Sequence, residues 1–347
     1  MGWSYPTHFR MGNRANRSRK SNGIAQTISQ KIIYSRVIMS SSNFSRQVYS
    51  KENKLKNIQQ LLVCPSCKSQ LKFFNDLISC KSCDFQVRQI SNDWFNLLGD
   101  RLLNKEETQW EERQQQMEDW YKNLVASPTA ASDCLTNDYA PFASYLATLS
   151  GAILDIGGGV GVVRHYLGDN TDYIVLDPSL DWLGIEWTSL IDRFPCLETK
   201  PCFVRGVGEY LPFASQTFDA VLSFWSLNHA SNPKQVFHEA ARVLRPGGKF
   251  LVVLEDMIPQ WHDFIDPEFP ASQVFESFFD PEKVSNGKYS RFKLFFRYLR
   301  GQWPLQSDHI RIREADILDW TRQDFQVLRR VWMNQFLTFE FKKLGKI

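Results

Sequence analysis

The sequence predicts an α/β protein, in which a mostly parallel, seven-stranded sheet carries helices on both faces and follows a small β-rich domain. Two observations predict this fold. From residue 150 onward, short apolar segments alternate with segments of helical periodicity, which is the pattern of a parallel sheet with crossover helices. Between residues 60 and 98, short strand-like runs are separated by turns and carry two closely spaced pairs of cysteines.

The elements of the large domain can be placed in order along the chain. Strands are expected at 152–156, 173–177, within 201–206, at 218–224 and at 249–256, followed by an antiparallel pair at 325–332 and 334–343. A helix is expected near 161–168. A second begins at Pro233 with Asn232 as its cap, and the Arg-Pro-Gly-Gly segment 245–248 is expected to end it.

Charge is unevenly distributed along the 347 residues. Residues 1–60 hold eleven Lys and Arg and one acidic residue, a charge of +10, and because the whole chain carries +3, the remainder carries −7. Such a body gains nothing as a whole from phosphate attraction, so any nucleic-acid contact would come from the basic stretch or from a local patch. No apolar run approaches the ~18–20 residues of a transmembrane helix, so no transmembrane segment is expected.

Residues 1–58 are expected to be a disordered or targeting basic segment. The first fifty contain no acid, which is typical of an organellar transit peptide, of a basic arm, or of an upstream start codon with Met39 as the true beginning. Seven cysteines without a disulfide framework favour a reducing compartment. We therefore expect a cytoplasmic protein, or organellar import if the first fifty residues are a transit segment.

Four cysteines form two C-x-x-C pairs within a predicted domain at 59–99: Cys64, Cys67, Cys80 and Cys83. Four thiolates complete a closed tetrahedral site, so this pattern indicates structural Zn²⁺ in a zinc ribbon. The alternatives are a redox pair or two disulfides, which two pairs at this spacing disfavour. A linker at 100–135 follows, with a helix expected over about 105–125 behind a capping box of Asn104 and Glu107.

A glycine-rich turn follows the first strand of the domain predicted at 136–347. Its residues have the spacing D-x-G-x-G-x-G: Asp155, Gly157, Gly159 and Gly161. A dinucleotide-binding turn would need glycine where Val162 stands. S-adenosylmethionine (SAM) has no phosphate and a cationic tail, so Asp155 suits its ammonium and Asp177 can accept from both ribose hydroxyls. Taken alone, such a turn also occurs at other nucleotide sites and at tight strand–helix junctions.

Residues 152–255 together resemble the class I SAM-dependent methyltransferases of the type 11 group, whose fold is Rossmann-like. The resemblance implies that segment 206–213 holds the adenine, where Val207 replaces the usual Asp and removes a side-chain hydrogen bond. Weakened cofactor binding is therefore expected. The further cofactor contacts that the resemblance implies are the backbone of Gly208 and Glu209, and Ser223 and Phe224 beside the methionine part.

The sulfonium of SAM makes its methyl group electrophilic, so a base is needed only if the acceptor carries a proton. His229, just past the fourth strand, is the candidate general base, and the alternative is a histidine that caps the following loop. Asp256, His262 and His309 are weaker candidates.

The cysteine pairs at 64–83 resemble the small zinc-ribbon proteins that activate tRNA and release-factor methyltransferases. They also resemble the head of bacterial rRNA guanine methyltransferases, where a histidine usually stands in place of Cys83. The second resemblance is therefore the weaker one.

Residues 283–307 hold six Lys and Arg and no acid, with Phe292, Phe295, Phe296 and Leu299 at helical spacing. Three interpretations are open: a lid helix over the substrate, an interfacial helix making peripheral membrane contact through 290–300, or an RNA-contact patch.

Three functions follow. The first is a SAM-dependent methyltransferase with a small-molecule, lipid or glycan acceptor. The second is an RNA or protein methyltransferase that uses the ribbon to present its substrate. The third is a non-catalytic scaffold.

Overall fold

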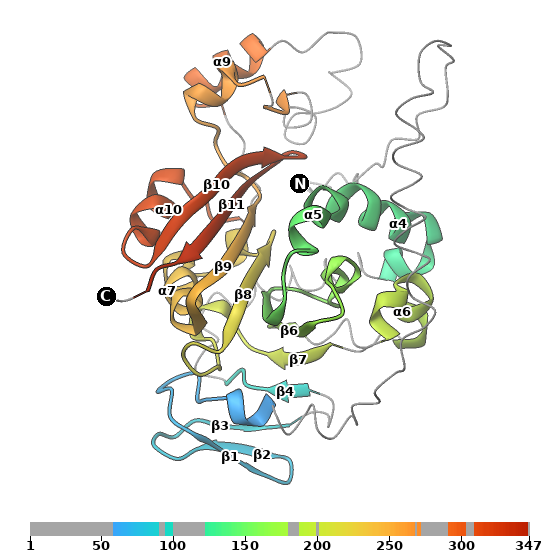
Figure 1. Cartoon of the computed structure of the whole chain (residues 1–347), viewed down its shortest axis with the longest axis vertical. Coiled ribbons are helices and arrows are strands. Elements are labelled where there is room, and N and C mark those ends of the chain that lie inside the picture. Colours follow the sequence, from blue (N-terminus) through green and yellow to red (C-terminus); the bar gives the residue numbers. More distant parts are fainter. Residues whose placement is uncertain are drawn as a thin grey trace, which may run out of the picture. The chain divides into compact units, whose positions relative to one another are not determined.

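The protein is described by a computed structural model (Figure 1). It describes residues 58–89, 94–99, 122–179, 187–198, 201–267, 269–271, 291–302 and 309–345, with the backbone alone for 291–294. The predicted segment 1–58 therefore lies almost entirely outside the described residues. The same holds for the expected capping box and for most of the expected helix at 105–125, of which residues 122–126 are seen as helical.

An eight-stranded sheet forms the centre of the molecule. Its order is β10 (Phe325–Met333), β11 (Phe336–Lys343), β9 (Leu244–Leu254), β8 (Phe218–Phe224), β5 (Gly151–Ile156), β6 (Thr171–Asp177), β7 (Cys202–Arg205) and β4 (Trp94–Asn96). The strands from β9 to β4 pair in parallel, whereas β11 pairs antiparallel with both neighbours. The seven predicted strands and the antiparallel hairpin are confirmed. The eighth strand, β4, was not predicted in this sheet.

Helices cover both faces of the sheet, as expected. In Figure 1, α7 (Pro233–Val243) and α10 (Glu314–Thr321) lie on one side, whereas α4 (Pro128–Asp133), α5 (Ala143–Leu146) and α6 (Trp187–Arg193) lie on the other. On the first side Phe237 of α7 packs between Phe250 of β9 and Trp320 of α10, with ring centroids 5.4 and 5.9 Å away. The predicted cap of α7 is confirmed, because the Asn232 side chain accepts from the Gln235 N–H at 3.2 Å.

Two expected elements differ from the structure. The helix near 161–168 is a short 3-10 turn, Val162–Tyr166, because Gly161 enters it in a left-handed conformation and the next strand starts at Thr171. Strand β9 begins at Leu244, five positions before the predicted start at 249. Its first residues pair with β8 through a register shift that Gly247, at φ 81°, accommodates.

A three-stranded antiparallel sheet lies beside the cysteine pairs: β1 (Leu71–Phe74), β2 (Leu77–Cys80) and β3 (Gln86–Arg88). Cys80 ends β2, and the other three cysteines lie in the turns before β1 and between β2 and β3. The chain then enters β4, which extends the large sheet by pairing with β7. A second connection lies at the start of the small sheet. There the Val63 N–H donates to the Pro212 carbonyl (3.0 Å), and the Ala214 N–H donates to Leu61 (2.9 Å).

The Lys68 ammonium strengthens this second connection. It lies 2.6 Å from the carboxylate of Glu239 in α7 and also donates to the Leu211 carbonyl at 3.2 Å. Burial lowers the pKa of Lys68, although the hydrogen bond with Glu239 opposes it. Burial acts to raise the pKa of Glu239, but hydrogen bonds from Arg242 and Lys68 outweigh it and lower the pKa. The ribbon and the segment implied to hold adenine are therefore linked by a partly buried ion pair.

Candidate active site

The glycine turn lies where β5 ends, at the carboxyl edge of the parallel strands. Gly157, Gly159 and Gly161 have φ values of 72°, 51° and 84°, a region that side chains disfavour. At Gly157 an added Cβ would lie 2.4 Å from the Cβ of Ser226, so the loop after β8 packs directly on the turn. Glycine is required here because any side chain would collide with the Ser226 side chain.

Asp155 is fully buried beneath this turn. Its Oδ2 accepts a hydrogen bond from the Tyr173 hydroxyl at 2.6 Å, whereas its Oδ1 has no hydrogen-bond partner among the described residues. Burial raises the pKa of Asp155 to about 7, although the Tyr173 hydrogen bond works against this shift. A buried acceptor without a partner is costly, so this carboxyl is suited to a donor or cation supplied by a ligand.

Asp177 ends β6, the strand next to β5. Its two carboxylate oxygens accept from the N–H of Gly159 (3.0 Å) and the N–H of Ser179 (2.9 Å). These bonds hold the carboxylate beside the glycine turn. The two predicted acids, Asp155 and Asp177, are thereby brought to the same edge of the sheet.

The segment implied to hold adenine, 206–213, contains a short 3-10 turn, Gly208–Tyr210. An added Cβ at Gly208 would lie 3.0 Å from Ile156, so this segment packs on the end of β5. The carboxylate of Glu209 accepts from the Asn232 N–H at 3.2 Å, at the start of α7. That side chain is therefore engaged with the protein, and any contact of Glu209 with a cofactor would come from its backbone.

The end of β8 is joined to the end of β5 through hydroxyl groups. Ser223 Oγ lies 2.7 Å from Ser226 Oγ, which donates to the Ile156 carbonyl at 2.7 Å. Phe224 packs edge-on against Phe142, with ring centroids 5.1 Å apart. Contact of Ser223 and Phe224 with a cofactor stays a prediction. Ser226, which the sequence patterns did not single out, connects the two strands.

His229 lies at the end of the 3-10 turn that follows β8, beside a second histidine. Its ring centroid is 4.5 Å from that of His309, and the two rings are perpendicular. The Nε2 atoms of His229 and His309 lie 3.6 and 3.3 Å from Oε2 of Glu255. His309 Nδ1 is hydrogen-bonded to the carboxylate of Asp256. Three of the four candidates for acid–base chemistry thus lie together, since Asp256 and His309 join His229.

The remaining candidate, His262, lies elsewhere. Its Nε2 is 3.9 Å from Asp263, and its side chain is half exposed. Sequence reasoning missed Glu255 and Asn228, which complete the group. Asn228 accepts from the Glu255 N–H (3.1 Å), and Ile310 donates to the Asn228 carbonyl (2.7 Å). The position of Glu255 near the carboxyl end of the predicted strand 249–256 was the available signal.

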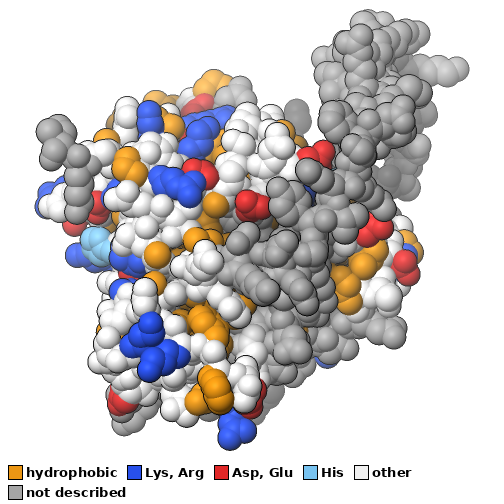
Figure 2. All heavy atoms as spheres, turned by 60° about the horizontal axis from the view of Figure 1, so that its bottom comes forward, with side chains coloured by type: hydrophobic (Ala, Val, Ile, Leu, Met, Phe, Trp, Pro, Cys, Tyr) orange, Lys and Arg blue, Asp and Glu red, His pale blue; other side chains and the backbone are white. Residues whose placement is uncertain are grey.

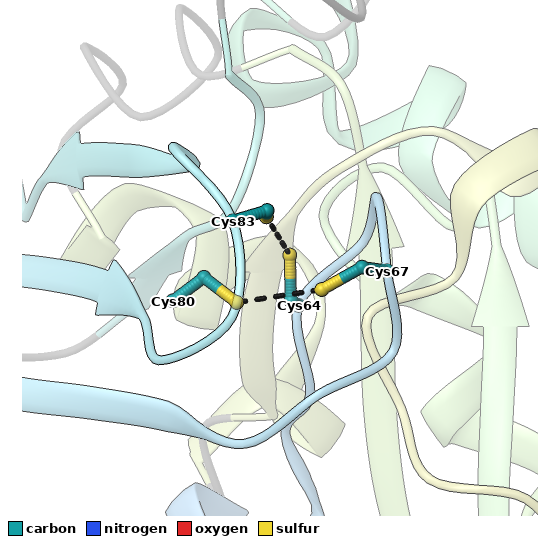
Figure 3. A group of neighbouring side chains, drawn as sticks. All are labelled: Cys64, Cys67, Cys80 and Cys83. Carbon is teal, nitrogen blue, oxygen red and sulfur yellow. Dashed lines mark hydrogen bonds between the residues drawn. The ribbon is translucent and has the colours of Figure 1, made fainter.

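The four cysteines point toward one another across the knuckles of the small sheet (Figure 3). Cys64 Sγ lies 3.6 Å from Cys83 Sγ, and Cys67 Sγ lies 3.4 Å from Cys80 Sγ. All four sulfurs lie within 4.8 Å of one another. Thiolates sharing one zinc at bonds of ~2.3 Å lie roughly 3.8 Å apart, so this donor set fits the ion.

The sheet order and a ligand edge at the strand carboxyl ends define a Rossmann-like α/β protein. Comparison with known proteins assigns one part of the chain: residues 154–252 match the family model described as a methyltransferase domain. The chain thus contains a class I SAM-dependent methyltransferase domain, as the resemblance of residues 152–255 implied.

Curated relatives match over part of their length. The ubiquinone/menaquinone C-methyltransferase UbiE of Cellvibrio japonicus is 30% identical over 29% of this chain and 41% of its own. The demethylmenaquinone methyltransferase of Renibacterium salmoninarum is 34% identical over 32% of this chain and 44% of its own. The mitochondrial 2-methoxy-6-polyprenyl-1,4-benzoquinol methylase of Dictyostelium discoideum is 25% identical over 40% and 36%. The chain spans less than half the length of these relatives.

Two solved structures are also similar. One is a complex of the Haloferax volcanii Trm112 methyltransferase activator with a methyltransferase (15% identity, TM-score 0.42, 65% of this chain and 98% of that chain). The other is the 1,6-didemethyltoxoflavin-N1-methyltransferase of Burkholderia thailandensis (16% identity, TM-score 0.38, 65% of this chain and 87% of that chain).

In the described part of the chain, no helix has both the length and the apolarity to cross a membrane.

Proposed function

We propose that this protein is a SAM-dependent methyltransferase whose acceptor is a small molecule, a lipid or a glycan. The observation that carries the proposal is the buried carboxyl of Asp155 at the glycine turn. Its Oδ1 lacks a hydrogen-bond partner among the described residues, although burial makes an unmet acceptor costly. A ligand ammonium would satisfy this atom and favour the charged carboxylate.

When bound, SAM supplies a methyl group that its sulfonium already makes electrophilic. Asp155 would pair with the ammonium, and Asp177, held by the Gly159 N–H, would accept from the ribose hydroxyls. Val207 offers no hydrogen-bonding side chain to the adenine, so backbone groups would have to hold it. The further proposed contacts are Gly208, Glu209, Ser223 and Phe224.

His229 is the proposed general base. The structure adds His309, Glu255 and Asp256 to its surroundings, so a proton leaving the acceptor would enter a group of two imidazoles and two carboxylates. Because this group follows the carboxyl ends of β8 and β9, it lies on the ligand edge of the sheet.

Two observations support a small or lipid-like acceptor. The relatives named above carry quinone or polyprenyl-quinol substrates in their names. In addition, α9 (Arg291–Leu299) exposes Phe296 and Leu299, which an amphiphilic acceptor could contact. Figure 2 shows one face of the molecule, on which the Lys and Arg side chains of the described residues stand in separate groups.

The four cysteines are proposed to hold one structural Zn²⁺, because four thiolates leave no open coordination position.

Presentation of RNA or protein by the ribbon remains the second candidate function, and its supporting observation is the direct pairing of β4 with the methyltransferase sheet. A scaffold that has lost its activity is the third. We propose a cytoplasmic location, with organellar import if residues 1–50 form a transit segment.

Calorimetric titration with S-adenosylhomocysteine tests the cofactor proposal. Saturable binding is expected for the wild type, and Asp155→Asn should weaken it. Asp172→Asn is the matched control, because this exposed acid lies on the neighbouring strand β6. Absence of binding by folded, zinc-loaded protein would favour the scaffold. With labelled SAM and cell extract, label in a lipid or small-molecule fraction would support the proposed acceptor, and label in RNA or protein would overturn it.

A further inference from the structure

We propose that His229, Glu255 and His309 form a second metal site, which binds a divalent cation such as Zn²⁺ or Mn²⁺. It is separate from the cysteine site in the ribbon. Unlike that site, it has three protein donors and leaves coordination positions for an oxygen of the methyl acceptor. With the ion bound, His229 Nε2 would be a ligand and not the general base, and the ion would instead lower the pKa of the acceptor oxygen. The site itself does not depend on methyl transfer, whereas its role toward the acceptor rests on the proposed function.

The distances suit a shared ion. The donor atoms of the three residues lie within 4.8 Å of one another, and Glu255 Oε2 lies 3.3 Å from His309 Nε2 and 3.6 Å from His229 Nε2. With metal–ligand bonds of ~2.0–2.2 Å, two donors on one ion lie roughly 3 to 3.5 Å apart. Only small side-chain movements would be needed to bind a cation.

The hydrogen bonding at His309 also calls for a positive charge. A neutral imidazole has one N–H donor, yet its two nitrogens face two different carboxylates, Asp256 at Nδ1 and Glu255 at Nε2. One carboxylate would then face a lone pair. Either a second proton on the ring or a cation between Nε2 and Glu255 removes this conflict, while the Nδ1–H donates to Asp256. The nearby donor atom of His229 favours the cation, because it adds a third ligand at the same point.

Asp256 stands where the outer partner of a metal-binding histidine is expected. Its carboxylate is fully buried, as is nearly all of the His309 side chain. A carboxylate on the far nitrogen orients the ring of a ligand histidine and strengthens it as a donor. Asp256 has φ 44°, a strained value for a residue with a side chain, and strain of this kind concentrates at functional sites.

One side of the group is open. The side chains of His229 and Glu255 are 32% and 23% exposed, whereas that of His309 is 3% exposed. A ligand could therefore reach the ion from the side of His229 and Glu255. An acceptor with a hydroxyl or enolic oxygen is the chemical class that such a position would bind.

Cobalt loading of the full-length protein tests the site, because the two candidate sites differ in spectrum. Thiolate ligands give intense sulfur-to-cobalt charge-transfer bands, whereas histidine and carboxylate ligands give only weak d–d bands. The wild type is expected to bind about two Co²⁺ per chain, as two sites of these donor types require. His309→Ala should remove one ion and leave the charge-transfer band unchanged.

Two further variants complete the test. His229→Gln, at a more exposed position, should also remove one ion even if loss of the buried His309 impairs folding. His262→Ala is the matched control, because that half-exposed histidine lies outside the group, and it should keep both ions. Wild-type protein that binds a single cobalt ion with thiolate bands, or His229→Gln that retains both ions, would overturn the proposal. Two ions without S-adenosylhomocysteine binding would contradict the proposed function but not the site.

Discussion

The cysteine group and the histidine group are both candidate metal sites, but the chain assembles them differently. Cys64, Cys67, Cys80 and Cys83 come from two tight knuckles within a span of only twenty residues, one before β1 and one between β2 and β3. His229, Glu255 and His309 come from three segments that follow β8, follow β9 and precede α10. The first group is a closed set of soft donors suited to holding a fold together. The second is an open set at a ligand edge, suited to binding a ligand.

The largest expected effect is loss of the ribbon. Cys64→Ser, or zinc chelation, should unfold the small sheet, because structural zinc contributes about 10–16 kcal/mol to such domains. Hydrogen exchange should show lost protection in β1–β3, while β5 and β8 stay protected. Cys196→Ser, at a cysteine outside the group, should leave the exchange pattern unchanged. Full protection of β1–β3 without zinc would show that the cysteine site is not needed to fold the ribbon, and would contradict its structural role.

The histidine group should show the opposite behaviour. His229→Gln is expected to lower methyl transfer about 10²–10⁴-fold, the usual contribution of a proton-transferring or ion-holding group, and to leave the affinity for S-adenosylhomocysteine within about 2-fold. Turnover and calorimetry on the same preparation measure both. An equal loss of cofactor affinity would indicate that His229 is a structural element of the cofactor pocket.

A third prediction uses pH to test Asp155 at the proposed cofactor site independently of the two candidate metal sites. Burial raises the pKa of Asp155 to about 7, so below that pH this carboxyl is protonated in the free protein. It must lose its proton before it can pair with a ligand ammonium. Affinity for S-adenosylhomocysteine should therefore rise about tenfold per pH unit below 7 and level off above it. Asp155→Asn should abolish this dependence.

The linkage also predicts the stability of the ligand-free protein. The pKa of Asp155 is higher in the folded than in the unfolded protein, so the proton on this carboxyl stabilises the fold. This contribution to the free energy of unfolding is fully present below the unfolded-state pKa and is lost as the pH rises through about 7. Thermal unfolding of the wild type and Asp155→Asn across this range measures the difference. An unchanged pH dependence of thermal unfolding in the variant would mean that another group controls the stability in this range.

The smallest expected effect concerns the connection between the ribbon and the catalytic sheet. Lys68→Met would leave the buried carboxylate of Glu239 with Arg242 as its remaining partner, so a cost of about 1–3 kcal/mol is expected. Because Lys68 also holds the Leu211 carbonyl, affinity for S-adenosylhomocysteine should fall several-fold. Lys72→Met, at an exposed lysine of β1, is the control in denaturant unfolding and calorimetry. If both variants behave alike, the ribbon does not support the cofactor edge through this ion pair.

Much of the catalytic domain could be predicted because its determinants are local. The apolar strand 218–224 and the Asn232 cap of α7 depend on neighbouring residues, and both are confirmed. The expected helix at 161–168 was wrong because periodicity does not report how little chain remains between Gly161 and the strand at Thr171. The early start of β9 was missed since a register shift depends on the strand beside it.

By itself, the sequence determined the methyltransferase class, the glycine turn with its two acids, and the four-cysteine group. The glycine turn and each cysteine pair depend on spacing within a short stretch, whereas the methyltransferase class depends on the motifs spread over residues 152–255. Only the tertiary structure decided that β4 joins the large sheet, that Lys68 reaches Glu239, and that His229, Glu255 and His309 meet. These contacts join residues far apart in the chain, which spacing alone does not report. His229 and Glu255 meet because parallel strands bring their carboxyl ends to one edge, whatever the length of chain between them.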